Sequence, residues 1–377
     1  MSPRRNFDRL RAREAMLARA GRRAPRVALL AHTARLVGPG PLWRDGRQRR
    51  RHGFPGLAAR NEVYRRIWRE AAADLGADFH DLGRGFVEVR RGRRSARIFQ
   101  QVTTIDDPVT MRMALDKPLV DRLLVAAGVN TAEPVESVFG DPRPAIELLQ
   151  RVGRCVVKPA SGTGGGEGVT ADVRDRADLL HARLRAARFD DVLLTEPHAS
   201  GPLYRLLLLA GELLDVIVDR PPHVVGDGRS TVEELIAAEN RRRMDAAGEA
   251  GLELLELDLD TALTLRRAGL ALRARPAEGR EVAVKSVTND RRLEDSHTYR
   301  AEVHPEVLRQ VAAAQRALGL RLVGIDVIAP RIDRPLAETG GVVIEVNGTP
   351  GIHRHYQVAE RGAATPVALP ILEYVLG

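Results

Sequence analysis

The sequence is poor in the residues that build disulfide-rich, metal-clustered or membrane-spanning proteins. Its 377 residues include a single cysteine, Cys155, in an apolar stretch typical of a core. One cysteine excludes a disulfide framework within the chain, a cysteine-based zinc site and a cysteine-ligated iron–sulfur cluster. No apolar run approaches the ~18 residues of a membrane-spanning helix, and the apolar stretch after the first arginines is too short for a signal peptide. We therefore expect a cytoplasmic protein with no membrane partner.

Aromatic residues are also scarce, at 4% of the chain, although residues 1–51 are strongly basic. These residues hold 15 arginines and three acids, a net charge of +12, whereas the whole chain carries +9. Such a segment can bind nucleic acid, an anionic surface or an acidic partner. Because few aromatic side chains are interleaved with the arginines for stacking on bases, nucleic acid is disfavoured. A solvated basic helix and arm is the favoured interpretation, with an acidic peptide or protein partner as the alternative.

Lysine is almost absent, since only Lys117, Lys158 and Lys285 occur beside 56 arginines. A bias this strong indicates GC-rich coding, under which most replaceable lysines have become arginines. The three remaining lysines are candidates for sites that need a compact ammonium on a flexible stem. The alternative for each lysine is that it has been kept by chance. The motifs around each lysine must decide between the two explanations.

The pattern of apolar residues, glycines and prolines predicts a mixture of helices, strands and hairpins. Helices are expected over 1–24, 57–76, 109–127, 174–187, 231–245 and 305–318. Strands are expected over 26–31, 86–90, 96–102, 191–195, 281–288, 321–328 and 341–346, a hairpin over 204–218 and a Gly/Pro/Arg loop over 37–54. This mixture indicates an α+β (mixed α/β) fold.

A glycine-rich loop, SGTGGGEG over residues 161–168, follows a short apolar strand that ends in Lys158 and Pro159. No lysine follows a glycine, which excludes the P-loop motif. The spacing G-x-G-x-x-G does not occur within the loop, which disfavours a Rossmann dinucleotide site. The kinase signature set, G-x-S-x-G and H-E-x-x-H are absent as well. A nucleotide site of another kind is the remaining interpretation of the loop.

Two carboxylates and an amide interrupt the last two apolar strands. Asp326 lies within one strand, and Glu345 and Asn347 lie two residues apart on the other, so that they point to the same face. Carboxylates inside apolar strands are costly unless they bind something. Oxygen ligands of this kind suit Mg²⁺ that also holds substrate phosphates. The alternative is that one or two of these residues merely end the strands. We favour a metal site.

Several of these motifs, in this order, resemble those of the ATP-grasp carboxylate–amine ligases, and in particular the ATP-grasp module of the cyanophycin synthetases. The resemblance covers about residues 105–356 and rests on Lys158-Pro with the glycine loop, Thr195-Glu196, GPLYR over 201–205, HVVGDGRSTVEEL over 223–235, EVHP over 302–305, GIDVIAP over 324–330 and Glu345-Val-Asn347. It implies two α+β lobes that sandwich ATP, preceded by an N-terminal α/β domain. The expected domains are 1–104, a basic segment with an α/β domain; 105–200, the small lobe with the glycine loop; and 201–377, the large lobe with the metal site.

The resemblance also implies a role for each matching residue. ATP is expected at Lys117, Lys158, Gly164, Gly165, Gly166, Gly168, Glu196, Ala199 and Leu203; two Mg²⁺, or Mn²⁺ in their place, at Asp326, Glu345 and Asn347; and the γ-phosphate or reacting carboxylate at Arg205, Lys285 and Asn289. Leu203 stands where the family often has an acid for the ribose hydroxyls, and residues 290–295 replace a small Ser-Thr-Gly-Gly stretch beside the substrate. Candidate substrate residues are Arg220, Arg291, His353 and Arg354, with Arg292 as a further arginine that could clamp a carboxylate.

The expected function is therefore ATP- and Mg²⁺-dependent formation of an amide or peptide bond between amino-acid-like substrates, through an acylphosphate and with release of ADP. Substrates other than those of cyanophycin synthesis are expected, because the departures fall at the substrate end. A modifier of a larger peptide or protein, recruited by residues 1–51, is the alternative within the family. A non-catalytic ATP-binding protein or a nucleic-acid-binding protein is the alternative outside it. The resemblance also implies a homodimer.

Overall fold

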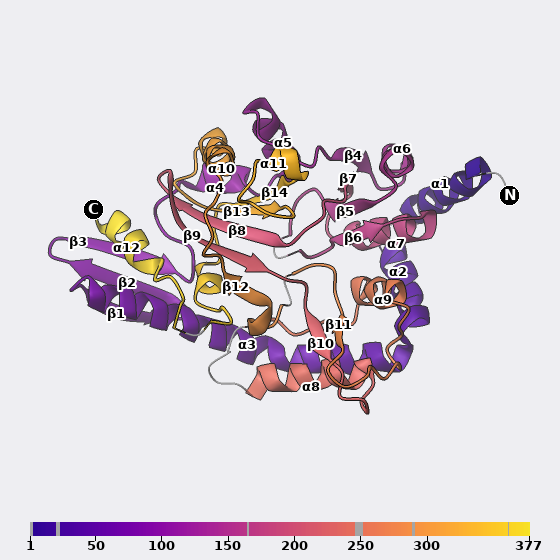
Figure 1. Ribbon diagram of the computed structural model, residues 1–377, viewed down its shortest axis with the longest axis horizontal. Coiled ribbons are helices and arrows are strands. Elements are labelled where there is room, and N and C mark those ends of the chain that lie inside the picture. The colour runs from indigo at the N-terminus through magenta and orange to yellow at the C-terminus, as the bar shows by residue number, and fades with distance from the viewer. Residues whose placement is uncertain (1–2, 20–22, 164–165, 246–251, 289–290, 361) are drawn as a thin grey trace.

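The computed structural model describes residues 3–19, 23–163, 166–245, 252–288, 291–360 and 362–377. Figure 1 shows the helices and four sheets of these residues in a mixed arrangement, which confirms the α+β prediction. Within this part of the chain, no helix is both long enough and apolar enough to cross a membrane.

The N-terminal part consists of three helices followed by a small antiparallel sheet. The elements are α1 (Pro3–Arg19), α2 (Arg23–Val37), α3 (Pro39–Asp74), β1 (Asp78–Gly83), β2 (Phe86–Arg91) and β3 (Arg94–Phe99). Two predictions are wrong here, because residues 26–31 are helical rather than a strand and residues 39–54 belong to α3 rather than to a loop. A short apolar run does not distinguish a strand from a buried helix. Packing of α2 on α7 and α3 decides in favour of the helix.

The next part forms a four-stranded antiparallel sheet in the order β4-β7-β5-β6. Its elements are α4 (Pro108–Met113), α5 (Lys117–Ala126), β4 (Val135–Val138), α6 (Arg143–Val152), β5 (Cys155–Pro159), β6 (Thr170–Val173), α7 (Arg176–Ala186) and β7 (Val192–Pro197). The helix expected over 109–127 is two helices, because Asp107 caps α4 and Asp116 caps α5 through backbone amides. The second cap fixes the start of α5 at Lys117.

The remaining part is built on a five-stranded antiparallel sheet in the order β12-β9-β8-β13-β14. Its strands are β8 (Leu203–Leu209), β9 (Glu212–Asp219), β12 (Ser296–Thr298), β13 (Leu322–Ile328) and β14 (Val342–Asn347), and β10 (His223–Val225) pairs separately with β11 (Glu281–Ala283). The helices are α8 (Val232–Asp245), α9 (Leu259–Arg267), α10 (Pro305–Leu318), α11 (Leu336–Thr339) and α12 (Ala368–Leu376), with 3₁₀ turns η1 (Leu293–Asp295) and η2 (Ile352–His355). The strand expected over 281–288 ends at Ala283.

The two faces of the five-stranded sheet differ, and the difference positions the site. On one face, Leu206, Leu208 and the odd-numbered residues of β13 pack in a core with α10 and α5. On the other face, Leu207, Leu209 and Leu322 pack in a second core with α3, β2, β3 and α12. Along β8 and β13 this second face changes from leucine to Arg205 and Asp326, because alternate residues of a strand share a face. Beyond the leucine core, the sheet therefore presents charged side chains.

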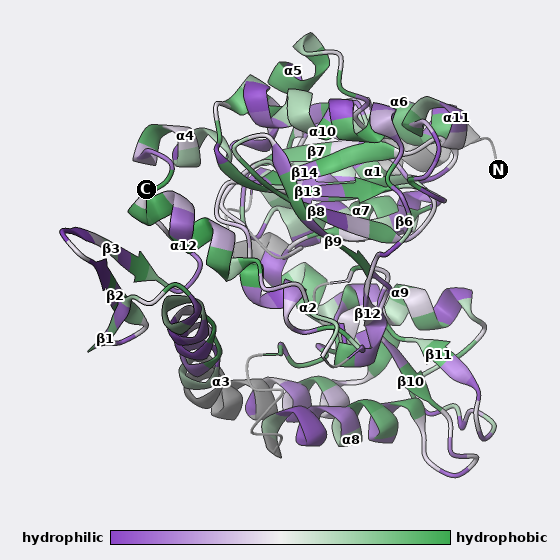
Figure 2. Ribbon diagram, turned by 60° about the vertical axis from the view of Figure 1, so that its left-hand side comes forward, coloured by the Kyte–Doolittle hydropathy of each residue, from purple (hydrophilic) through white to green (hydrophobic). Residues whose placement is uncertain are grey.

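Helix α3 is the longest element, with 36 residues. In Figure 1 it runs along one side of the molecule, past α2 and α8, to the sheet of β1 to β3. Figure 2 shows α12 beside α3, and the apolar side chains of both helices share the core under Leu207 and Leu209. The N-terminal residues are thus part of the packing of the large sheet.

Candidate functional site

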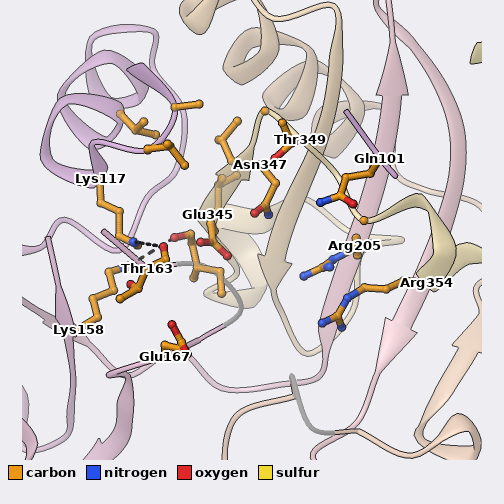
Figure 3. Close-up of a pocket in the computed structure, with 18 of the residues that line it drawn as sticks. Gln101, Lys117, Lys158, Thr163, Glu167, Arg205, Glu345, Asn347, Thr349 and Arg354 are labelled. Atoms are coloured by element: carbon orange, nitrogen blue, oxygen red, sulfur yellow. Dashed lines mark hydrogen bonds between the residues drawn. The ribbon is translucent and has the colours of Figure 1, made fainter. Parts of the chain in front are cut away.

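A cavity of about 410 Å³ lies where the polar face of the five-stranded sheet meets the four-stranded sheet. Side chains reach it from β5, β7, β8 and β14, from α5 and α3, and from the segment that follows β14. Figure 3 shows Lys117 and Lys158 on one side, Arg205 and Arg354 on the other, and Glu345 and Asn347 between them. We call the side of Lys117, Lys158 and Thr163 the lysine end, and the side of Arg205, Arg291 and Arg354 the arginine end.

The lysine end brings together two of the three lysines singled out in the sequence. Lys117 is the first residue of α5, and its Nζ donates to the carbonyl oxygen of Thr163 at 3.4 Å. Lys158 lies on β5, and its Nζ is 2.6 Å from Oε2 of Glu196 on β7. Burial lowers the pKa of Lys117, although the nearby Glu345 carboxylate opposes that shift. Both ammoniums are therefore desolvated groups that gain by contact with further negative charge.

The glycine-rich loop closes this end, as far as it is described. Gly166 and Gly168 have positive φ values of 74° and 77°, and Glu167 between them lines the cavity. A Cβ at Gly168 would lie 2.9 Å from the ring of Phe189 and 3.1 Å from Pro159, so the position accepts no side chain without movement. Gly164 and Gly165, also expected at the phosphates, lie outside the described residues.

The three oxygen ligands predicted for a metal lie on neighbouring strands. Asp326 of β13 pairs in register with Glu345 of β14, and Gly324 pairs with Asn347, so the three side chains share one face. Glu345 and Asn347 line the cavity. Burial and the neighbouring Asp326 raise the pKa of Glu345. Asn347 Nδ2 is buried without a hydrogen-bond partner in the described part of the chain.

Asp326 is covered by Arg205 and does not reach the cavity itself. In the register of β8 and β13, Arg205 lies opposite Asp326. Its Nε and Nη2 donate to the two carboxylate oxygens at 2.9 and 2.6 Å. Burial alone would lower the pKa of Arg205, but the Asp326 carboxylate holds it above its usual value. Among the described residues, no three His, Cys, Asp or Glu side chains form a group that could hold a metal ion, so Asn347 is needed to complete the predicted set.

The arginine end is built around one buried carboxylate. Asp219, at the end of β9, accepts from Arg291 Nε at 2.8 Å and from Ser296 Oγ at 2.6 Å. Arg354 Nη1 lies 3.6 Å from the other oxygen of Asp219. Burial opposes ionisation of Asp219, but Arg291 and Arg354 hold its pKa below the usual value. Burial and repulsion from Arg205 and Arg291 lower the pKa of Arg354 to about 10.

A second cavity, of about 370 Å³, meets the first at Glu196 and Ile344. It is lined by Val156, Ile328 and Ile344, by the segment from Glu196 to Ala199, and by Lys285. Lys285 therefore lies apart from the other two lysines, with its Nζ 3.0 Å from Asp258 and 3.4 Å from the carbonyl oxygen of Glu256. The segment after Ala199 is tightly placed, since a Cβ at Gly201 (φ 124°) would lie 2.2 Å from the carbonyl oxygen of Ala329.

Two further residues named from the sequence line neither cavity, and a third lies outside the described residues. Leu203 is buried at the start of β8 and lines neither cavity. Arg220 pairs with the exposed Glu281 at 3.3 Å, also away from both cavities. Asn289 lies outside the described residues. Arg291, His353 and Arg354 line the first cavity and remain candidate substrate residues.

The structure adds residues that the sequence analysis missed. Arg60 of α3, Gln101 after β3 and Thr349 after β14 line the cavity, and Tyr64 of α3 contacts His353 from behind. Among 56 arginines, nothing marks Arg60 in the sequence. The spacing of Arg60 and Tyr64, four residues apart in a predicted helix, was the available signal for a shared face.

The architecture is that of the ATP-grasp fold. Two sheets face a common cavity, a glycine-rich loop follows a lysine on a strand, and adjacent strands carry an Asp and a Glu-x-Asn. In sequence, the chain is similar to ligases of the ATP-grasp superfamily. No protein-family profile matches it. It is 30% identical over 274 residues to a cyanophycin synthetase of Nostoc sp. (strain PCC 7120), covering 72% of this chain and 30% of that protein.

One further relative and one solved structure are similar to the chain. The chain is 29% identical over 262 residues to the glutathione biosynthesis bifunctional protein GshAB of Mannheimia succiniciproducens, covering 67% of this chain and 34% of that one. The crystal structure of a bifunctional glutathione synthetase from Pasteurella multocida superposes with a TM-score of 0.54 at 22% identity, covering 83% of this chain and 43% of that chain. The chain thus spans about a third of the length of the curated relatives it matches.

Proposed function

We propose that the protein is an ATP- and Mg²⁺-dependent carboxylate–amine ligase that joins amino-acid-like substrates and releases ADP. The observation that carries the proposal is the convergence of Lys117, Lys158, Glu345 and Asn347 on one cavity between two sheets. Groups of opposite charge and oxygen donors at this spacing suit a nucleotide triphosphate with its metal. The domain division at 104/105 and 200/201 remains part of this proposal.

The nucleotide in this proposal spans both cavities. The second cavity, with apolar walls from Val156 and Ile344 and the backbone from Glu196 to Ala199, would hold adenine. The phosphates would reach Lys158 and Lys117, with the amides of Gly166 and Gly168 as further donors. Lys285 lies in the second cavity beside Asp258, so its contact with the terminal phosphates is the least supported of the three. Leu203 offers no group for the ribose.

The residues present suit Mg²⁺, since each of Asp326, Glu345 and Asn347 supplies oxygen. The Nδ2 atom of Asn347 has no hydrogen-bond partner among the described residues, so no hydrogen bond through that atom fixes the side-chain amide. Bound Mg²⁺ would neutralise the charge of the β- and γ-phosphates. Asp326 is held by Arg205 in this structure, so Glu345 and Asn347 are the ligands that the cavity presents directly.

The chemistry proceeds in two displacements. An oxygen of the substrate carboxylate attacks the γ-phosphorus, and the bond between that phosphorus and the β,γ-bridging oxygen breaks. ADP leaves, and the substrate becomes an acylphosphate. The amine nitrogen then attacks the acyl carbon, loses a proton, and inorganic phosphate leaves with the former carboxylate oxygen. Lys117 and Lys158 stabilise the charge on the phosphates, and Arg205, Arg291 and Arg354 orient the carboxylate. No side chain serves as a nucleophile.

A second candidate is an ATP-grasp modifier of a larger peptide or protein. The basic residues 1–51 favour it, because they would attract an acidic chain. A non-catalytic nucleotide-binding protein is the candidate outside this chemistry, and a homodimer remains an expectation from the resemblance.

The test is ADP and phosphate release with Mg²⁺-ATP over one panel of amino acids and dipeptides and a second panel of acidic peptides, with hydroxylamine present to trap the acylphosphate. Acid-dependent ADP release with a hydroxamate product supports the ligase and identifies the acid. Turnover only with acidic peptides supports the modifier. ATP binding without turnover on either panel contradicts both, and absence of ATP binding contradicts the nucleotide site.

A further inference from the structure

A network of buried charged groups connects the glycine-rich loop with Lys285. Arg185 of α7 donates through Nη1 to the carbonyl oxygen of Val169 at 2.7 Å and through Nη2 to Oδ2 of Asp258. The same carboxylate oxygen lies 3.0 Å from Nζ of Lys285. Arg185, Asp258 and Lys285 are 8%, 9% and 3% exposed, so these contacts are made away from water. Contacts between charged groups are stronger in such surroundings than at the surface.

The position of Asp258 is fixed by the helix that follows it. Asp258 is the N-cap of α9, and its Oδ1 accepts from the backbone amide of Thr261 at 3.1 Å. Because this bond holds Oδ1, the other oxygen, Oδ2, is turned to Arg185 and Lys285. Burial opposes ionisation of Asp258, but Arg185 and Lys285 hold its pKa below the usual value. Asp258 is therefore a charged and oriented acceptor for both cations.

A second carboxylate of the same helix holds the residue after Lys285. Asp260 accepts from the backbone amide of Ser286 at 2.9 Å and also from its hydroxyl group. Lys285 itself donates to the carbonyl oxygen of Glu256 at 3.4 Å. Lys285 and Ser286 both line the second cavity. The start of α9 thus determines where the ammonium of Lys285 lies in that cavity.

The other end of the network lies where the glycine-rich loop ends. The backbone amide of Val169 donates to the carbonyl oxygen of Gly166 at 3.1 Å, which closes a turn, and Glu167 within this turn lines the first cavity. Arg185 holds the carbonyl oxygen of Val169 and so anchors the turn. Arg185 itself lines neither cavity. It can therefore act on a ligand only through the residues that it holds.

We propose, building on the nucleotide site of the proposed ligase, that Arg185 is a positioning residue that couples the glycine-rich loop to Lys285 through Asp258. The two separated donors of one planar guanidinium can hold a loop and a carboxylate at the same time. The loop connects β5 with β6, and Lys285 follows β11, so the network joins parts of the chain that belong to different sheets. The contacts of the loop and of Lys285 with the nucleotide are thereby made together and lost together.

The first experiment measures hydrogen exchange of backbone amides in the full chain without nucleotide. Asp258→Asn keeps the cap of α9, because asparagine and aspartate cap helices about equally well, but it removes the charge that Arg185 and Lys285 face. In this proposal Asp258 acts on Val169 only through Arg185. We expect the amide of Val169 to exchange at least about tenfold faster, the loss typical of a hydrogen bond to a charged group.

Asp260→Asn is the matched control, since Asp260 belongs to the same helix start and holds Ser286. This variant is expected to raise the exchange of the Ser286 amide and to leave that of Val169 unchanged. The amides of β13 report the stability of the whole fold, and exchange at Val169 is compared with theirs in each variant. Faster exchange at Val169 relative to β13 in both variants, or in neither, overturns the coupling.

The second experiment measures the binding of Mg²⁺-ADP to the full chain by titration calorimetry. Lys285→Met removes the ammonium and keeps a side chain of similar length, and Arg185→Gln removes the guanidinium. Each change is expected to weaken ADP binding at least about tenfold. The double variant is expected to bind ADP no more weakly than the weaker single variant, because residues of one network do not act additively. Losses that multiply in the double variant overturn the coupling.

Two further variants test whether the shape of the guanidinium matters. Arg185→Lys keeps the positive charge, but its single nitrogen does not reproduce the two separated donors, so ADP binding should stay weaker than in the parent protein. Full ADP affinity in this variant overturns the role assigned to Arg185. Arg122→Gln, at an exposed arginine that pairs with Glu136 and lines neither cavity, is expected to leave ADP binding unchanged.

The outcomes separate this inference from the ligase function. Non-additive losses of ADP binding, in a protein that forms no hydroxamate, support the coupling and contradict the ligase. Faster exchange at Val169 in Asp258→Asn alone, in a protein that binds no ADP, supports the coupling and contradicts the nucleotide site. Hydroxamate formation in a protein whose ADP losses multiply supports the ligase and overturns the coupling.

Discussion

The lysine end and the arginine end of the cavity differ in how their buried positive charges are compensated. At the lysine end, Lys158 has Glu196 at 2.6 Å, and Lys117 has the Glu345 carboxylate as its main favourable charge. Each ammonium thus has a nearby carboxylate. At the arginine end, Asp326 is paired with Arg205, and Asp219 lies against both Arg291 and Arg354.

The comparison teaches which ligand each end suits. Ammoniums beside carboxylates suit a polyphosphate that arrives with its own cation, since phosphate oxygens would contact the ammoniums and the metal would contact the carboxylates. Planar guanidiniums suit the carboxylate of a substrate. In the proposed ligase, the lysine end therefore takes the nucleotide and the arginine end takes the acid.

Among the changes that test this comparison, the largest effect is expected at Asp219. Asp219→Asn removes the carboxylate shared by Arg291 and Arg354, leaving buried guanidiniums uncompensated, and should lower the free energy of unfolding by about 3–5 kcal/mol. Chemical denaturation measures it. Asp333→Asn, at an exposed pair with Arg331, is the matched control and should cost less than about 1 kcal/mol. Equal losses in the two variants would contradict the role of Asp219 as a buried partner of these arginines.

The next effect tests the lysine end. Lys158→Ala removes a desolvated ammonium at the proposed phosphates and should lower ADP formation about 100- to 1,000-fold, the range for loss of one preorganised electrostatic group. Full ADP formation in this variant would show that the lysine end does not hold the nucleotide.

A smaller effect is expected at Gly201, which joins the proposed adenine segment to β8. Gly201→Ala places a Cβ against the carbonyl of Ala329 at a φ of 124°, and strain of this kind costs about 1–3 kcal/mol. We expect a lower melting temperature and a higher KM for ATP. The matched control is Gly211→Ala, whose Cβ would meet nothing within 4 Å although its φ is also positive.

The smallest effect is expected at Arg220. Its pair with Glu281 has both side chains more than half exposed, so Arg220→Gln should change stability by less than about 1 kcal/mol. KM for ATP and for the acid should also stay within about twofold of the parent values. A loss of acid binding here would return Arg220 to the substrate site, where the sequence comparison had put it.

The sequence singled out the charged residues of both ends, but not how those of the arginine end are paired. Lys117, Lys158, Glu345 and Asn347 could be found because rare residues and strand periodicity mark them, and the structure brings them to one cavity. The pairing of Asp326 with Arg205 depends on the register of β8 and β13, which no local pattern specifies. Arg60 and Tyr64 depend on how α3 packs, which is a tertiary property.

The errors in the fold have the same physical origin. Residues 26–31 form an apolar run that suits a strand or a helix equally, and contacts with α7 select the helix. The glycines and prolines of 39–54 indicated a loop, yet this stretch is helical within α3. Local propensity is a weak prior where tertiary packing opposes it.

Helix α3 has a consequence for how the chain can be divided. With 36 residues it extends about 54 Å, at a rise of 1.5 Å per residue. A fragment that begins at residue 105, where the family resemblance begins, would discard Arg60, Tyr64 and Gln101 together with the cover over Leu207, Leu209 and Leu322. The unit recognisable in the sequence is therefore smaller than the unit that folds and encloses the cavity. A minimal excised protein would have to start upstream of α3, however little its first residues resemble those of its relatives.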